Sequence, residues 1–99
     1  MSKGAVLVDW RDNVALLTLN RPERRNAVDL ESLLLIREAQ VEAQKRKIRA
    51  LVLTGTAPAF CAGADLAGVR EDVFHETLNE VLRGFTQLPC VTIAAIDGP

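Results

Sequence analysis

Two uninterrupted apolar runs, residues 50–54 and 91–96, each follow a stretch with helical periodicity. The first run reads Ala-Leu-Val-Leu-Thr and the second reads Val-Thr-Ile-Ala-Ala-Ile. Runs without polar alternation are typical of strands that are covered on both faces in a parallel sheet. Because parallel strands need a long crossover between them, the helices are expected to connect these strands in right-handed units.

The N-terminal half predicts a hairpin and a long helix. Residues 6–8 and 14–19 are rich in β-formers and flank the polar turn residues 11–13, as in a hairpin. Asp29 is a suitable N-cap for a helix that runs to about Arg46. The apolar residues of this helix fall on two sides, with Leu30, Leu33, Leu34 and Val41 on one and Leu35, Ile36, Ala39 and Ala43 on the other. A helix that is apolar on two sides is expected to have two packing partners.

A second helix is predicted over residues 71–88, where apolar residues recur at a period of 3.6. The stripe consists of Phe74, Leu78, Val81, Leu82, Phe85 and Leu88. The complete order is therefore β-β-α-β-α-β with a mainly parallel sheet, which is the α/β class. The sequence contains no internal repeat and no linker, so residues 1–99 are expected to belong to a single domain without an internal boundary.

Composition and charge exclude several classes of function. Twelve basic and thirteen acidic residues give a net charge of -1, and this balance argues against a nucleic-acid surface. No run is long enough for a signal peptide or a membrane span. Cys61 and Cys90 have neither metal-ligand nor disulfide-framework spacing. The expectation is a cytoplasmic protein with no metal site, no nucleic-acid partner and no membrane partner.

The stretch that could carry chemistry is residues 59–66, which leaves the carboxyl end of the predicted strand 50–54 and is rich in small residues. Ligands of open α/β sheets bind at that end, and small residues let a ligand approach the main chain. If a short helical turn begins near Asp65, the N–H groups of Ala64 and Asp65 would be free donors. Such donors suit an oxygen that gains negative charge during a reaction. Spacing alone leaves the alternative of a structural loop in which Asp65 caps the next helix.

Four segments resemble, in order, motifs of the crotonase superfamily, which comprises the enoyl-CoA hydratases and isomerases. The segments are LNRPERRNAV at 19–28, LVLTG at 51–55, AFCAGADL at 59–66 and IAAIDG at 93–98. The resemblance covers essentially the whole chain. It implies the N-terminal part of a ClpP/crotonase fold and an enzyme that polarises an acyl-CoA thioester for hydration or double-bond isomerisation.

The resemblance also implies roles for particular residues. The Ala64 N–H would be the first of two oxyanion donors, and Asp65 would help to hold its loop. From chemistry alone, Arg24 and Arg25 could equally serve surface solubility or phosphate contact, and the resemblance favours contact with the phosphates of coenzyme A. The residues expected to contact substrate or coenzyme are Arg24, Arg25, Ala27, Ala62, Gly63, Ala64, Asp65 and Leu66. No cofactor is implied, because coenzyme A is part of the substrate, and a homotrimer or hexamer is expected by analogy.

By the same resemblance, the second oxyanion donor lies in a glycine-rich stretch just after residues 93–98, and the acid and base glutamates lie later still. Because hydration needs the second oxyanion donor as well as the acid and base glutamates, the 99 residues alone are expected to be inactive. Two alternatives stay open. One is a member of the superfamily that binds acyl-CoA without turnover, and the other is a truncated remnant without function.

Other reactive side chains are expected to be structural. Cys61 and Cys90 are interpreted as packing residues, and His75 as a solvated helix position. Trp10 is expected to pack near a turn. The carboxylates Glu71, Asp72, Glu76 and Glu80 are expected to form a solvated acidic helix face.

Overall fold

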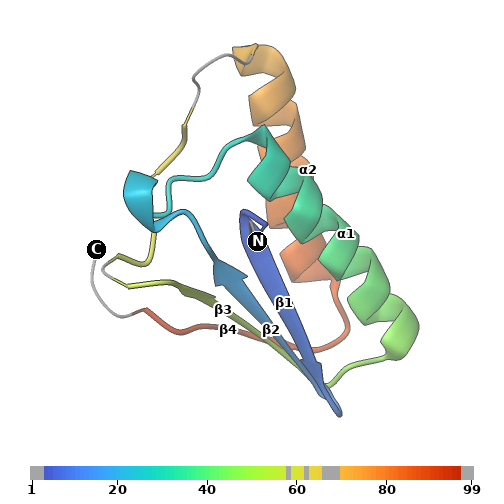
Figure 1. The fold of residues 1–99 in the computed structure, drawn as a ribbon. Helices are drawn as coiled ribbons and strands as arrows, with labels where there is room; N and C mark the ends of the chain where they lie inside the picture. The colour runs from blue at the N-terminus through green and yellow to red at the C-terminus, as the bar shows by residue number, and fades with distance from the viewer. Residues whose placement is uncertain (1–3, 58, 62, 66–69, 97–99) are drawn as a thin grey trace.

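The predicted α/β architecture is confirmed by the computed structural model, which describes residues 4–57, 59–61, 63–65 and 70–96. The elements in chain order are β1 (Val6–Arg11), β2 (Val14–Leu19), the 3-10 turn η1 (Pro22–Arg24), α1 (Leu30–Arg46), β3 (Ala50–Gly55), α2 (Glu71–Gln87) and β4 (Val91–Ala94). The strands form one sheet in the order β1-β2-β3-β4. β1 is antiparallel to β2, and the other neighbours are parallel. The two helices pack against each other beside this sheet (Figure 1).

The hairpin forms where the sequence predicts it. Val6 lies opposite Leu19 and Arg11 lies opposite Val14, so Asp12 and Asn13 make the turn between the strands. Asp12 has a φ of 53°, a left-handed conformation that a short polar side chain tolerates. The turn therefore lies at the end of the sheet opposite to the carboxyl ends of β2 and β3.

Helix α1 begins and ends as predicted, because its caps are strong. The Asp29 Oδ1 atom accepts a hydrogen bond from the Ser32 N–H at 2.9 Å, which satisfies one of the free donors of the first turn. Lys47 has a φ of 54°, and its N–H bonds back to the last turn of the helix.

The predicted division of α1 into two apolar sides is partly wrong. The buried apolar residues of the helix are Leu33, Ile36, Ala39 and Ala43, whereas Leu34 and Val41 are 50% and 43% exposed. Leu33 and Ile36 are three residues apart and share a face, so Leu33 belongs with the core rather than with Leu34. Among the described residues, α1 packs against α2 and against strands β1 and β2.

The apolar stripe of α2 is confirmed except at Leu82, which is 54% exposed. Phe74 and Val81 are buried, and Leu78, Phe85 and Leu88 pack against the core cluster. Leu82 therefore lies at the exposed edge of this stripe.

Complete coverage of the apolar strands is not observed. In β3 only Leu51 is fully buried, and every residue of β4 is exposed, with Val91 at 62% and Ile93 at 47%. The described helices lie beside one face of the sheet, where α1 packs against β1 and β2, while the residues of β4 are exposed on both faces (Figure 1). An apolar edge strand of this kind favours association with another chain.

The contact between Gln40 of α1 and Gly84 of α2 gives a first prediction. Gln40 is buried and its Nε2 donates to the Val81 carbonyl at 2.9 Å, while a Cβ added at Gly84 would overlap the Gln40 amide. We expect Gly84→Ala to lower the free energy of unfolding by about 1–3 kcal/mol, although alanine favours helices by about 1 kcal/mol. In a Gln40→Ala background the same change should be neutral or stabilising.

Urea unfolding followed by circular dichroism at low protein concentration measures both effects. An equal loss from Gly84→Ala in the two backgrounds would show that the overlap with Gln40 is not the cause.

Candidate functional site

Two loops meet beyond the carboxyl ends of β2 and β3. The Val28 N–H donates to the Gly63 carbonyl at 2.8 Å, and the Asp65 N–H donates to the Val28 carbonyl at 2.7 Å. These bonds make an isolated parallel bridge in which Val28 is opposite Ala64. Because successive peptide groups of an extended segment point to opposite sides, the Ala64 N–H points away from Val28.

Ala64 therefore presents its N–H on the open side of the bridge. The residue is exposed, and no backbone carbonyl in the described part of the chain accepts a hydrogen bond from it. Gly63 has a φ of 123°, a conformation that side chains disfavour, which explains why glycine precedes this donor.

The expectation of a second free donor at Asp65 is wrong, because the Asp65 N–H is used in the bridge to Val28. The helical turn that was expected to begin there falls on residues 66–69, which lie outside the described residues. Ala62 and Leu66, expected to contact the substrate or coenzyme, lie outside them as well.

The Arg21 guanidinium connects the two loops. Its Nη1 donates to the Ala27 carbonyl at 2.6 Å, and its Nη2 lies 3.1 Å from Asp65 Oδ2. The Arg21 and Asp65 side chains are only 17% and 15% exposed, so solvent screens this ion pair less than a surface pair. Nη2 also lies 3.7 Å from Asp29 Oδ2, and this contact ties the site to the first turn of α1.

Asn26 joins the same loops at a second point. Its side chain is buried, and its Oδ1 accepts a hydrogen bond from the Arg21 backbone N–H at 2.8 Å. Its Nδ2 donates to the carbonyls of Thr56 and Ala59, each at 2.6 Å. Asn26 has a φ of 61°, a region that asparagine tolerates better than most residues. One amide group thus satisfies three backbone groups from both loops.

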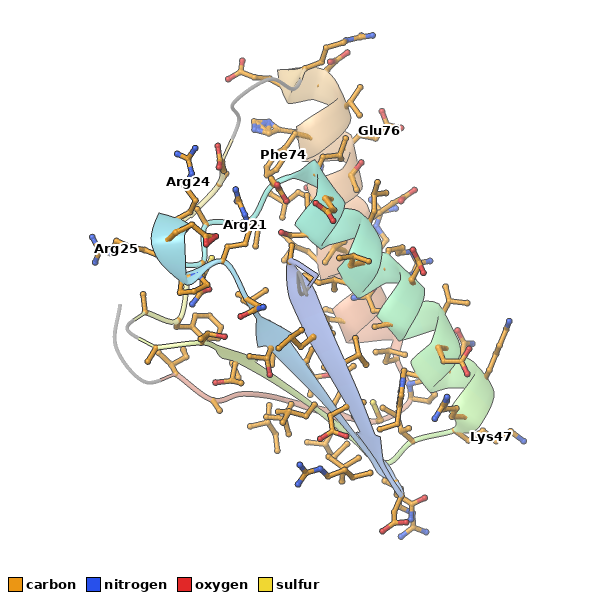
Figure 2. All side chains as sticks on the ribbon, viewed as in Figure 1. Arg21, Arg24, Arg25, Lys47, Phe74 and Glu76 are labelled. Atoms are coloured by element: carbon orange, nitrogen blue, oxygen red, sulfur yellow. The ribbon has the colours of Figure 1, made fainter. Side chains whose placement is uncertain are left out.

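Arg24 and Arg25 lie at η1, on the loop that carries Val28. Both are exposed, and neither forms an ion pair with another described residue. Figure 2 shows their side chains directed away from the molecule, whereas Arg21 lies between η1 and the start of α1. Ala27 is half-buried, and its carbonyl faces Arg21. The structure therefore brings the basic loop and Ala64 together through the Val28 bridge.

Sequence reasoning missed the roles of Arg21 and Asn26. Arg21 and Asp65 are 44 residues apart, and no spacing rule pairs them. Asn26 did offer a signal, because an asparagine inside a short loop often adopts a left-handed conformation and bonds nearby main chain.

The remaining polar residues agree with their structural interpretations. His75 and the carboxylates of α2 are exposed, and the Arg70 guanidinium lowers the pKa of Asp72. Cys61 is half-buried with its Sγ 3.7 Å from the Gly63 carbonyl, and burial raises the pKa of Cys90. In the described segments no three histidine, cysteine or acidic side chains are placed to hold a metal ion. Neither described helix is long and apolar enough to cross a bilayer.

The fold and the site define an α/β chain in which an open backbone N–H lies beside a basic turn at the carboxyl edge of the sheet. The family model described as enoyl-CoA hydratase/isomerase matches residues 9–99. The chain therefore belongs to the enoyl-CoA hydratase/isomerase family.

Individual relatives agree with this assignment. A Mycobacterium tuberculosis protein named "Probable enoyl-CoA hydratase echA6" is 39% identical over 90 residues, which cover 87% of this chain and 36% of the relative. The solved enoyl-CoA hydratase of Bacillus anthracis has a TM-score of 0.82 at 30% identity, over 95% of this chain and 40% of that one. A Mycobacterium avium enoyl-CoA hydratase structure, at 23% identity, shares the fold with a TM-score of 0.89, over 100% of this chain and 41% of that one. The chain thus spans well under half the length of these proteins.

Proposed function

We propose that the chain contributes to an acyl-CoA site in which the Ala64 N–H donates a hydrogen bond to the thioester carbonyl oxygen. The observation that supports this proposal is the Val28–Ala64 bridge, which directs the Ala64 N–H to the open side. A fixed donor at an oxygen that gains negative charge lowers the barrier of acyl-transfer and enolate chemistry.

The proposed reaction is hydration, or double-bond isomerisation, of an enoyl-CoA. Removing a proton beside the carbonyl, or adding water across the conjugated double bond, moves charge onto the thioester oxygen, where a donor is most effective. Ala64 supplies one donor, so the reaction also needs a second donor and acid and base groups. The 99-residue chain is therefore proposed to bind and polarise a thioester without turnover and without a cofactor of its own.

The test removes the Ala64 N–H without changing a side chain. Cys61 allows native chemical ligation of residues 1–60 to residues 61–99, so a synthetic second segment can carry lactic acid in place of Ala64. The resulting ester replaces the Ala64 N–H with an oxygen and leaves the bond from the Asp65 N–H to the Val28 carbonyl in place. The bond from the Val28 N–H to the Gly63 carbonyl is kept but weakened, because an ester carbonyl is a poorer acceptor than an amide carbonyl.

The measured quantity is the ¹³C shift of the thioester carbonyl of labelled acetyl-CoA. We expect the all-amide ligated chain to move this resonance downfield on binding, and the ester chain to bind with the shift largely lost. A bound thioester with an unchanged shift in the ester chain would refute the oxyanion role of Ala64.

Turnover is measured separately with crotonyl-CoA. We expect no hydration by the 99-residue chain, and clear hydration would contradict the proposed need for further groups.

Arg24 and Arg25 are proposed to contact the phosphates of coenzyme A. Because both side chains are exposed, replacing either with alanine should weaken binding only about 2–5-fold, and the loss should shrink at high salt. Titration calorimetry of coenzyme A measures these affinities. Lys47→Ala is the matched control, since Lys47 is an exposed cation at the C-terminal cap of α1, far from η1 (Figure 2). An equal loss with Lys47→Ala would show non-specific charge attraction instead.

A further inference from the structure

We infer that Arg21 is a positioning residue, which fixes the register of residues 63–65 against Val28 so that Ala64 is the residue whose N–H stays open. The inference rests on the proposed function for its consequence in catalysis. Its structural part concerns this chain alone and can be tested without a ligand.

The geometry that supports the inference is the double attachment of one guanidinium. Nη1 bonds the Ala27 carbonyl on one strand of the bridge, and Nη2 pairs with the Asp65 carboxylate on the other. A planar guanidinium holds such partners in a fixed relation because its donors diverge at set angles. Ala27 and Asp65 are the neighbours of Val28 and Ala64, so the clamp spans the bridge next to its central pair.

Register decides which N–H is open. In an extended segment the N–H groups alternate between the two sides. A slip of one residue therefore exchanges the N–H groups that face Val28 for those that face away from it. After such a slip the Ala64 N–H would face Val28, and the neighbouring N–H groups would face outwards. A single isolated bridge has few bonds of its own to prevent this slip.

The Arg21 guanidinium is not needed merely to hold the two loops together, because Asn26 already does so. The Asn26 side chain holds the first loop to Thr56 and Ala59, upstream of the bridge, and does so without the Arg21 guanidinium. Loss of the guanidinium should therefore leave the loops together but free the register of residues 63–65.

The first measurement uses the ligand-free chain. Couplings across hydrogen bonds, detected by NMR, report the pairs Val28 N–H to Gly63 carbonyl and Asp65 N–H to Val28 carbonyl. We expect both couplings to disappear in Arg21→Gln and to persist in Arg24→Gln, a matched change on the same loop. Asp65→Asn keeps an acceptor but removes the ion pair, so it should also weaken the couplings. This variant tests the inference if Arg21→Gln does not fold. Full couplings in Arg21→Gln, or in Asp65→Asn if only that variant folds, would overturn the inference.

The second measurement separates positioning from binding. With labelled acetyl-CoA, Arg21→Gln should keep most of its affinity but lose the downfield carbonyl shift, whereas Arg24→Gln should lose affinity but keep the shift when saturated. An unchanged shift in saturated Arg21→Gln would overturn the positioning role while the proposed function stands. No shift in the unmodified chain would instead refute the proposed function, and the ligand-free couplings would still decide the register.

Discussion

Asn26→Ala is expected to lower the free energy of unfolding by about 3–5 kcal/mol, a large part of the stability of a domain this size. The change leaves the Arg21 N–H and the carbonyls of Thr56 and Ala59 without their shared partner. It also places alanine at a φ of 61°, which asparagine tolerates better. Urea unfolding of the 99-residue chain, followed by circular dichroism, measures the loss.

Two further variants separate these causes. Asn26→Gly removes the backbone strain but not the loss of hydrogen bonds, so it should recover only the smaller part of the stability. Asn26→Asp keeps the shape but offers no donor to the carbonyls of Thr56 and Ala59, so it should be at least as unstable as Asn26→Ala near neutral pH. Wild-type stability in Asn26→Asp would show that the two donated bonds do not hold the loops.

Phe74→Ala is the second change with a large expected effect. Phe74 is fully buried in the core cluster and is the largest such side chain, so its truncation should cost about 3–5 kcal/mol. Leu82→Ala is the matched control on the same helix, because Leu82 is 54% exposed and its truncation should cost less than about 0.5 kcal/mol. The same urea unfolding measures both.

Similar losses from Phe74→Ala and Leu82→Ala would contradict the description of the core. In that case Leu82 would have to be covered in solution, for example by a second copy of the chain.

Much of the fold follows from local rules. The start of α1 follows from Asp29, whose side chain bonds the N–H of Ser32, and the hairpin follows from a short polar turn between two β-rich runs. The order of strands and helices then leaves a parallel sheet as the natural arrangement. These features depend on residues that are close in sequence.

Burial was harder to predict, because it depends on which faces other elements cover. An apolar run such as residues 91–96 is compatible with coverage on one face or on two, and periodicity cannot distinguish them. The same limit applies to α1, where Leu33 and Leu34 are adjacent in sequence but differ completely in exposure.

The candidate site was likewise predictable from the sequence only in part. The basic loop with Arg24 and Arg25 and the small-residue loop around Ala64 were predictable from composition and from the resemblance to a family. The Arg21–Asp65 pair and the bonds of Asn26 to Thr56 and Ala59 join segments about thirty or more residues apart. Such pairs arise from tertiary contact, and no local pattern in the sequence encodes them.

Trp10 gives the chain an intrinsic optical reporter. The protein has one tryptophan and no tyrosine, so fluorescence excited in the near ultraviolet originates almost entirely from this residue. The Arg46 guanidinium lies 4.3 Å from the centroid of the Trp10 ring and also bonds Glu42, which places the end of α1 against the hairpin. Emission therefore reports separation of α1 from β1 at the hairpin end, while opening of the loops at Val28 and Ala64 would leave it unchanged. A fluorescence transition at lower urea than the circular dichroism transition would identify this contact as the first part of the chain to unfold.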